Sequence, residues 1–329
     1  MRTHTFGRLG WQVSEIGHGL WGAGGWTGSD DEESIAAMVR SMELGCTFYD
    51  TALAYGQGKS EQLLGRALKH GSRGPEGPRL REHLRVATKI PPKNLKWPAS
   101  AASTLDEVFP ADHIRACTET SLKNLDLPSV DLQQFHVWSD TWATDDRWQR
   151  AADDLKREGL VRAIGISINR FEPTNVVQAL RTGVVDSVQV VYNLFDRGAQ
   201  DDLFAICREL GVAVIVRVPF DEGSLTGTLT PDTTWPDGDF RNSYFAPDRL
   251  KETCRRIDLV REDLPDGMSM ADMALRFILC NQDVTTIIPG MRRPKHVDAN
   301  LAISDGHGLS PALLERLARH RWDRVSTVA

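Results

Sequence analysis

Strand-like and helix-like segments alternate along nearly the whole chain, and this alternation restricts the possible folds more than any other feature. The strand candidates are Val13–Trp21, Thr47–Thr51, Leu84–Ile90, Leu132–Trp138, Val161–Ile168, Ser187–Asn193, Val212–Val218 and Val284–Ile288. The helix candidates are Glu32–Leu44, Ser60–Lys69, Asp112–Asn124, Asp145–Glu158, Pro173–Arg181, Gln200–Leu210, Met268–Cys280 and Pro294–Ile303. Strands separated by helices of this length indicate a parallel sheet. Eight such units predict an α/β fold, a closed (β/α)8 TIM barrel.

The chain has 329 residues and no linker or change of composition that would divide it. Barrels of this type often reach such a length as one domain, so we expect residues 1–329 to form a single barrel domain. Two connections are long, at about 91–110 and 220–267. Loops that follow barrel strands lie on the catalytic face, and we expect these two to cover it.

Charge and composition exclude several classes of partner. The net charge is -6, which does not favour binding to nucleic acid or to an anionic membrane. No apolar run approaches the roughly 18 residues that a membrane span needs, and the N-terminus has no apolar signal region. The five cysteines are scattered, without a C-x-x-C pair. We therefore expect reduced thiols in a cytoplasmic protein, and the oligomeric state stays open.

Four titratable side chains lie at or just beyond the ends of three successive strand candidates: Asp50, Tyr55, Lys89 and His136. A phenol has a pKa of about 10 and is a poor acid in water. An ammonium group at Lys89 would favour the phenolate of Tyr55, and Asp50 would keep Lys89 charged. His136 can orient a carbonyl oxygen while Tyr55 protonates it. This grouping predicts carbonyl reduction, with hydride from an external cofactor.

The same residues, together with several short segments, resemble the aldo-keto reductases. The matching segments are FYDTA at 48–52, AYG at 54–56, RAIGIS at 162–167 and IPG at 288–290, followed by Asn300. The likeness extends over nearly the whole chain, and it points to the branch that contains aryl-alcohol dehydrogenases and potassium-channel β-subunits. The resemblance implies that Asp50, Tyr55, Lys89 and His136 form the catalytic tetrad. It also implies a barrel that binds NADP(H) without a metal and reversibly reduces aldehydes or ketones to alcohols.

The resemblance also implies a set of cofactor contacts around the strand ends. Ser167 or Asn169, with Gln189, would hold the nicotinamide carboxamide, and Arg217 would stack on the ring. Arg292 would grip a 2′-phosphate, which favours NADP over NAD. The full set is Gly19, Trp21, Ser167, Asn169, Gln189, Arg217, Pro219, Gly223, Leu225, Gly227, Gly290, Arg292, His296 and Asn300.

Tryptophans near the strand ends predict the character of the substrate pocket. Trp21, Trp26, Trp97 and Trp138 are expected to line it, which favours a small-molecule carbonyl or alcohol with an apolar or aryl body. The physiological substrate and the reaction direction stay open.

Other readings of the sequence compete with this one. Residues 17–22 spell G-x-G-x-x-G, but Gly24 and Gly25 prolong a loop where a dinucleotide-binding motif requires a helix. An aldolase with Lys89 as Schiff-base amine would leave Tyr55 unexplained. A regulatory protein that binds NADP(H) with little turnover is the main alternative function. The nine histidines show no metal-ligand spacing.

Overall fold

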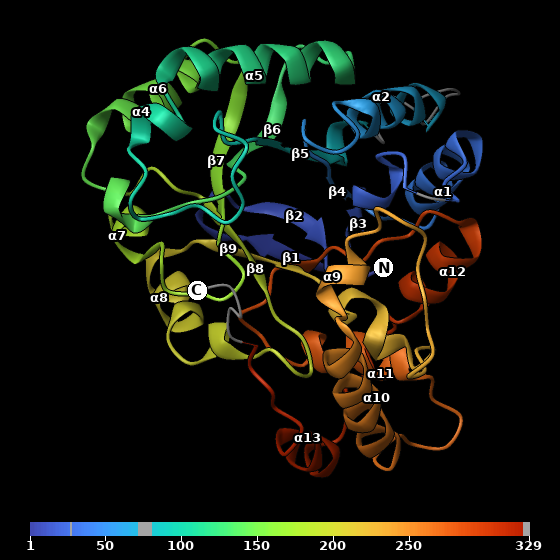
Figure 1. Ribbon diagram of the computed structural model, residues 1–329. Coiled ribbons are helices and arrows are strands. Elements are labelled where there is room, and N and C mark those ends of the chain that lie inside the picture. The colour runs from blue at the N-terminus through green and yellow to red at the C-terminus, as the bar shows by residue number, and fades with distance from the viewer. Residues whose placement is uncertain (27, 72–80, 325–329) are drawn as a thin grey trace.

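A computed structural model describes residues 1–26, 28–71 and 81–324. Eight parallel strands follow one another around a barrel in chain order, from β3 to β10 (Figure 1). Single bridges from Ile16 to Ile287 and from Gly19 to Gly290 close the last seam. The barrel strands are β3 (His18–Gly19), β4 (Phe48–Asp50), β5 (Arg85–Ile90), β6 (Val130–Phe135), β7 (Val161–Ser167), β8 (Ser187–Val191), β9 (Ala213–Arg217) and β10 (Thr286–Ile287).

Helices follow the strands and cover the outside of the barrel, so the predicted (β/α)8 fold is confirmed. The eight covering helices are α1 (Asp31–Glu43), α2 (Lys59–Gly71), α5 (Ala111–Leu125), α6 (Asp146–Arg157), α7 (Val177–Arg181), α8 (Leu203–Leu210), α11 (Met270–Leu279) and α12 (Pro294–Ala302). In the described part of the chain, none of the helices has the length and apolar character needed to cross a bilayer.

The first strand candidate, Val13–Trp21, is wrong as a single strand. It divides into β2 (Trp11–Ser14) and β3, and β2 pairs antiparallel with β1 (Thr3–Phe6) in an N-terminal hairpin. The hairpin side chains Phe6 and Val13 pack against the apolar residues at the lower end of the barrel interior. The hairpin therefore closes the end of the barrel away from the predicted catalytic face.

The long connections contain helices that the sequence analysis missed. Residues 220–267 include α9 (Arg241–Tyr244) and the 15-residue α10 (Pro247–Arg261), which begins with Pro at a position that favours it. Residues 91–110 include the short α4 (Leu105–Val108) with a capping box. Helix α13 (Pro311–Ala318) follows the barrel. Short 3-10 turns are η1 (Gly7–Leu9), η2 (Trp21–Ala23), η3 (Asp140–Trp142), η4 (Gly198–Gln200) and η5 (Asp221–Thr226).

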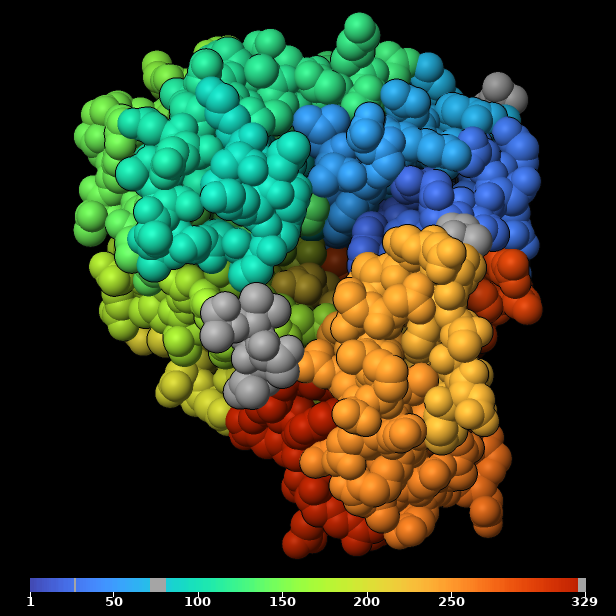
Figure 2. All heavy atoms as spheres, in the orientation of Figure 1, coloured from blue at the N-terminus to red at the C-terminus, as the bar shows by residue number. Residues whose placement is uncertain are grey.

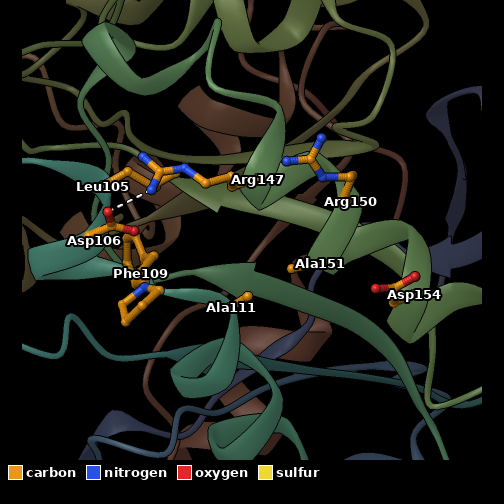
Figure 3. A pocket seen from close by; sticks show the side chains of 9 residues that line it. Leu105, Asp106, Phe109, Ala111, Arg147, Arg150, Ala151 and Asp154 are labelled. Carbon is orange, nitrogen blue, oxygen red and sulfur yellow. Dashed lines mark hydrogen bonds and ion pairs between the residues drawn. The ribbon is translucent and has the colours of Figure 1, made fainter.

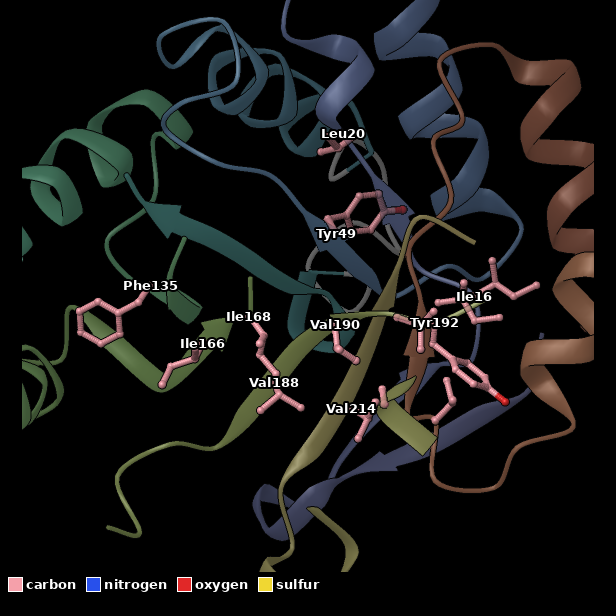
Figure 4. Packing of buried hydrophobic residues seen from close by; sticks show 14 of the residues in the cluster. Ile16, Leu20, Tyr49, Phe135, Ile166, Ile168, Val188, Val190, Tyr192 and Val214 are labelled. Carbon is pink, nitrogen blue, oxygen red and sulfur yellow. The ribbon is translucent and has the colours of Figure 1, made fainter. Parts of the chain in front are cut away.

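Side chains alternate between the two faces of each strand, and this alternation separates the apolar core outside the barrel from the site inside it. Outward-facing residues such as Val188, Val190 and Val214 join the large apolar core beneath the helices (Figure 4). The inward-facing residues nearest the N-terminal hairpin form a second apolar cluster, which includes Ala87 and Leu132. On β4, β5 and β6 the same inward face carries a polar side chain two residues further along, at Asp50, Lys89 and Gln134. Because side chains on a strand alternate between faces, this spacing brings the polar groups together at the upper end.

Candidate active site

Lys89 is the centre of the polar group inside the upper end of the barrel. Its Nζ donates to Asp50 Oδ1 at 2.5 Å, to the Thr51 carbonyl at 2.7 Å and to the Tyr55 hydroxyl at 3.2 Å. Lys89 and Asp50 are almost completely buried. The three donor positions of the ammonium group are thus all used, and one of them bears on the phenol. The structure brings Asp50, Tyr55 and Lys89 together as the sequence predicts.

The second oxygen of Asp50 is held by two glutamines. Asp50 Oδ2 accepts from Gln134 Nε2 at 3.0 Å and from Gln189 Nε2 at 2.8 Å. Gln189 Nε2 also donates to Gln134 Oε1 at 3.1 Å. The sequence analysis missed Gln134, although it lies two positions after the inward-facing Leu132 of β6 and therefore shares its strand face. Gln189, expected at the nicotinamide, makes its contacts with Asp50 and Gln134 here.

Burial and the neighbouring charges act in opposite directions on Tyr55 and Lys89. Burial raises the pKa of Tyr55; the nearby Lys89 ammonium lowers it, and burial dominates. Lys89 thus acts on the phenol in the expected direction, against the effect of burial. Burial lowers the pKa of Lys89, but Asp50 and Tyr55 outweigh it and the pKa lies above its ordinary value. At neutral pH the site holds an ammonium beside a protonated phenol.

His136 completes the predicted tetrad. Its ring stands edge-on to Tyr55, with centroids 5.6 Å apart, and edge-on to Trp97 at 5.8 Å. Burial, followed by the charges of Lys89 and Arg217, holds the pKa of His136 well below its usual range. Nδ1 is buried and has no hydrogen-bond partner within the described ranges. The imidazole is thus neutral and can donate one N–H to a carbonyl oxygen.

Some of the residues expected around the nicotinamide already make hydrogen bonds within the protein, and others have polar atoms that make none among the described residues. Asn169 is engaged: its Nδ2 donates to the Ala99 carbonyl at 3.1 Å and to Glu172 at 2.9 Å, and its Oδ1 accepts from the Ala99 N–H. The Ser167 hydroxyl makes no hydrogen bond among residues 1–26, 28–71 and 81–324. Arg217 donates to the Ile168 carbonyl at 2.8 Å, and its Nε has no partner there.

The segment after β9 has an unusual backbone. Asp221, Glu222 and Gly223 have consecutive positive φ angles of 46°, 57° and 102°, and Gly227 ends η5 at 74°. Gly223 is open, since a Cβ there would meet nothing within 4 Å. Leu225, expected at the cofactor, has a completely buried side chain, so only its backbone is available. Pro219 is also buried.

The start of α12 is strongly basic. Arg292, Arg293, Lys295 and His296 follow the exposed Gly290, where a Cβ would meet nothing. Burial and its cationic neighbours lower the pKa of His296. Asn300 lies buried within α12. Gly19 has a structural reason to be glycine, because a Cβ would come within 2.5 Å of the Ile288 carbonyl across the barrel seam.

Aromatic side chains surround the approach to the tetrad. Trp21 and Trp97 are 40% and 47% exposed, and Trp21 lies 6.4 Å from the Tyr55 ring between centroids. Phe240, missed by the sequence analysis, contacts Trp21 at 4.8 Å and Trp26 at 5.3 Å. Figure 2 shows a hollow in the surface between the teal loop after β5 and the orange segment after β9. These rings form an aromatic rim on the side of Tyr55 and His136.

Trp138 does not belong to that rim, so its prediction as a pocket residue is wrong. It is completely buried and packs edge-on against Trp142 at 5.6 Å and Trp148 at 5.1 Å. It lies two positions beyond His136, but the strand ends at Phe135, so strand alternation no longer sets its direction.

A groove of about 310 Å³ lies elsewhere, on the outside of the barrel. It runs between α4, α5 and α6 and is lined by Phe109, Arg147 and Asp154, among others (Figure 3). Arg147 is paired with Asp106 at 2.6 Å. The tetrad residues do not line this groove, and it is not part of the candidate site. In the described part of the chain, no group of acidic, histidine and cysteine side chains is arranged to hold a metal ion.

Comparison with known proteins agrees with the predicted fold and family. Residues 15–320 match the model of the aldo/keto reductase family. The chain is 29% identical to aldo-keto reductase YhdN of Bacillus subtilis over 303 residues, covering 88% of this chain and 85% of that protein. It is 27% identical to the NADH-specific methylglyoxal reductase of Escherichia coli, over 88% and 89% of the two chains. The holo form of aldo-keto reductase AKR11C1 from Bacillus halodurans superposes with a TM-score of 0.76 at 25% identity, over 100% and 99% of the two chains.

The barrel and the buried group around Lys89 define an oxidoreductase of the TIM-barrel class. The chain belongs to the aldo/keto reductase family. It is an enzyme that reduces carbonyl groups with a nicotinamide cofactor.

Proposed function

We propose that this protein is an NADP(H)-dependent reductase of aldehydes or ketones, in which Tyr55 supplies the proton. The observation that carries the proposal is the contact of one ammonium group, Lys89 Nζ, with both Asp50 at 2.5 Å and the Tyr55 hydroxyl at 3.2 Å. A buried cation next to a phenol stabilises the phenolate that forms as the proton leaves.

The residues present fit a phosphorylated dinucleotide. Arg292, two residues before α12 begins, suits a 2′-phosphate, because a helix N-terminus and arginine both favour anions. The open Gly223 allows close approach to the diphosphate. For the carboxamide we favour Ser167 over Asn169, since Asn169 is already bound to Ala99 and Glu172. The bound cofactor would supply the hydride.

In the proposed reaction each tetrad residue acts on the carbonyl oxygen or on its proton donor. His136, neutral because of its lowered pKa, donates a hydrogen bond that orients the oxygen. Tyr55 then donates its proton as negative charge develops there. Lys89 stabilises the phenolate left behind, while Asp50 fixes the position of Lys89. Oxidation of the alcohol uses the same groups in the opposite order.

The aromatic rim supports a substrate with an apolar body. Trp21, Trp97 and Phe240 offer flat apolar surfaces on the approach to Tyr55 and His136. Such rings pack best against aromatic or branched aliphatic groups. We therefore propose aryl or large aliphatic aldehydes and ketones as the substrate class. We further propose that the chain acts as a single barrel domain in the cytoplasm, in keeping with its five free cysteines.

The test is NADPH oxidation, followed by absorbance, with a panel of aryl, aliphatic and sugar aldehydes. We expect turnover with aryl and apolar aldehydes, and a loss of about 10²–10⁴-fold in kcat for Tyr55→Phe. NADPH binding, measured by fluorescence, should be the same in both proteins. A Tyr55→Phe variant that keeps full activity would overturn the role of the phenol. Turnover restricted to sugar or small charged carbonyls would overturn the substrate class.

A further inference from the structure

The turn that begins η5 adopts a conformation that its own sequence disfavours. Asp221 and Glu222 have φ angles of 46° and 57°, a region in which residues with a Cβ are strained. Such a conformation persists when surrounding contacts hold it in place.

Contacts from three distant segments hold the two acidic side chains. The completely buried Asp221 carboxylate accepts from Tyr244 of α9 at 2.8 Å and is ion-paired with Arg324 near the C-terminal end of the described chain. Arg170, which follows β7, donates to Glu222 at 2.9 Å and to the Tyr244 hydroxyl at 2.6 Å. Within η5 itself, Ser224 donates to Asp221 at 2.6 Å.

Arg324 is a buried cation whose ion-pair partner among the described residues is Asp221. Its side chain is 2% exposed, and its guanidinium lies over the rings of Trp322 at 4.1 Å and Tyr244 at 5.3 Å. Its Nε and Nη1 have no hydrogen-bond partner among the described residues. A buried cation of this kind depends on its carboxylate partner, because both groups are almost completely shielded from water.

The segment that carries Arg324 is itself anchored to the barrel. The Trp322 N–H donates to the Phe195 carbonyl at 2.8 Å, and the two rings meet edge-on at 5.8 Å. Arg256 of α10 also lies over the Trp322 ring, at 4.2 Å. Residues 322–324 thus connect the loop after β8 to η5 through ring contacts and the ion pair of Arg324 with Asp221.

We propose that Arg324 is a positioning residue that holds η5 in the conformation needed to retain the cofactor diphosphate. The inference rests on the proposed function, in which the backbone from Gly223 to Gly227 approaches that diphosphate. Without Arg324, the Asp221 carboxylate loses its closest cation and keeps the more distant Arg170, at 3.5 Å, so the left-handed turn loses part of its support. The dinucleotide then dissociates faster, while the tetrad on the strands is unchanged.

The experiment compares Arg324→Met with Arg319→Ala in the full-length protein. Arg319 lies five positions earlier and pairs with Asp263, and its side chain is 57% exposed, so it is a matched control. NADPH dissociation is followed by stopped-flow fluorescence and affinity by titration. We expect at least a tenfold faster dissociation and a similarly raised Kd for Arg324→Met. The control should match the wild type, and KM for the carbonyl substrate should be unchanged.

A second pair of variants separates positioning from general damage. Asp221→Asn should accelerate dissociation in the same way, and the Asp221→Asn/Arg324→Met double variant should show less than the product of the two effects. Arg324→Lys should restore part of the retention. Wild-type dissociation in Arg324→Met, or equal effects in Arg324→Met and Arg319→Ala, would overturn the proposal. Failure of the wild type to bind NADPH or NADH would instead overturn the proposed function.

Discussion

Two buried ion networks of similar chemistry lie near the upper end of the barrel, and they are supported very differently. In the first, Lys89 and Asp50 lie on adjacent strands with regular backbone. In the second, Asp221 is held in a left-handed turn by Arg170 and Arg324, which come from remote loops. The proposed chemistry uses the strand network and the proposed cofactor retention uses the loop network.

The two kinds of backbone support suit different functions. Parallel pairing fixes Lys89 opposite Gln134 in register, so the side chains around Asp50 cannot move without disturbing the sheet. The loop network has no such register, and its geometry depends on the mutual fit of several segments. A fixed arrangement suits proton transfer, whereas a surface that admits and releases a dinucleotide needs segments that can open.

Removing the cation of the strand network should have the largest effect. In Lys89→Met the buried Asp50 carboxylate loses its ion pair, which costs about 3–5 kcal/mol of unfolding free energy. Tyr55 loses the cation that stabilises its phenolate, so kcat should fall by about 10²-fold or more. Steady-state kinetics and urea unfolding measure the two effects. NADPH affinity should change much less than kcat, because the proposed contacts with the diphosphate and the 2′-phosphate lie on the loops.

A double variant distinguishes catalysis from folding in the strand network. Asp50→Asn/Lys89→Met replaces both charges by neutral groups, so it should recover much of the stability lost in Lys89→Met. Turnover should stay low, since no ammonium faces Tyr55. Recovery of kcat together with stability would show that Lys89 acts only by holding the fold.

A substitution in the basic segment before α12 should have an effect of intermediate size, on the affinity for the cofactor. Arg292→Ala should raise the Kd for NADPH by roughly tenfold or more, because a hydrogen bond to a charged group contributes about 1.5–3 kcal/mol. The Kd for NADH, which lacks the 2′-phosphate, should be unchanged. Arg293→Ala is the control, since Arg293 is directed to Glu33 at 3.4 Å. Equal weakening of NADPH and NADH would contradict a 2′-phosphate contact at Arg292.

The same contrast explains what the sequence could predict. Strand ends in a parallel barrel meet at one face, so the positions of Asp50, Lys89 and His136 follow from the pattern of strands and helices. The alternation of side chains along the strand also predicts that Gln134 faces the site, but the sequence analysis did not identify it. The N-terminal hairpin was not found because its first strand, Thr3–Phe6, is short and only partly buried.

The loop network had no comparable signal in the sequence. Asp221 and Arg324 are 103 positions apart, and their contact depends on where two loops and α9 come to lie. Trp138 was wrongly predicted for a related reason. The strand ends at Phe135, so the alternation of side chains could not show where Trp138 points. Helix α10 was detectable, since its buried residues Leu250, Cys254 and Ile257 recur at helical spacing.

The smallest expected effect concerns Asp196, a buried neighbour of the loop network. Burial raises its pKa to about 7, despite the nearby Arg170, and its Oδ2 has no hydrogen-bond partner among the described residues. The folded pKa lies above the unfolded value of about 3.9, so the folded state binds the proton more tightly. Stability from this group is therefore present at low pH and lost as pH rises through 7.

Asp196→Asn should remove this pH dependence. The unfolding free energy of the wild type should fall by about 1 kcal/mol more than that of the variant between pH 6 and pH 8. Urea unfolding at a series of pH values measures the difference, and the tetrad should be unaffected, so kcat at a single pH serves as the control. Parallel pH profiles for the two proteins would mean that Asp196 is ionised in the fold, paired with the arginines of the loop network. The loop network would then hold three carboxylates, those of Asp221, Glu222 and Asp196, against the two guanidinium groups of Arg170 and Arg324. The strand network has no such surplus of negative charge, because it pairs one ammonium with one carboxylate.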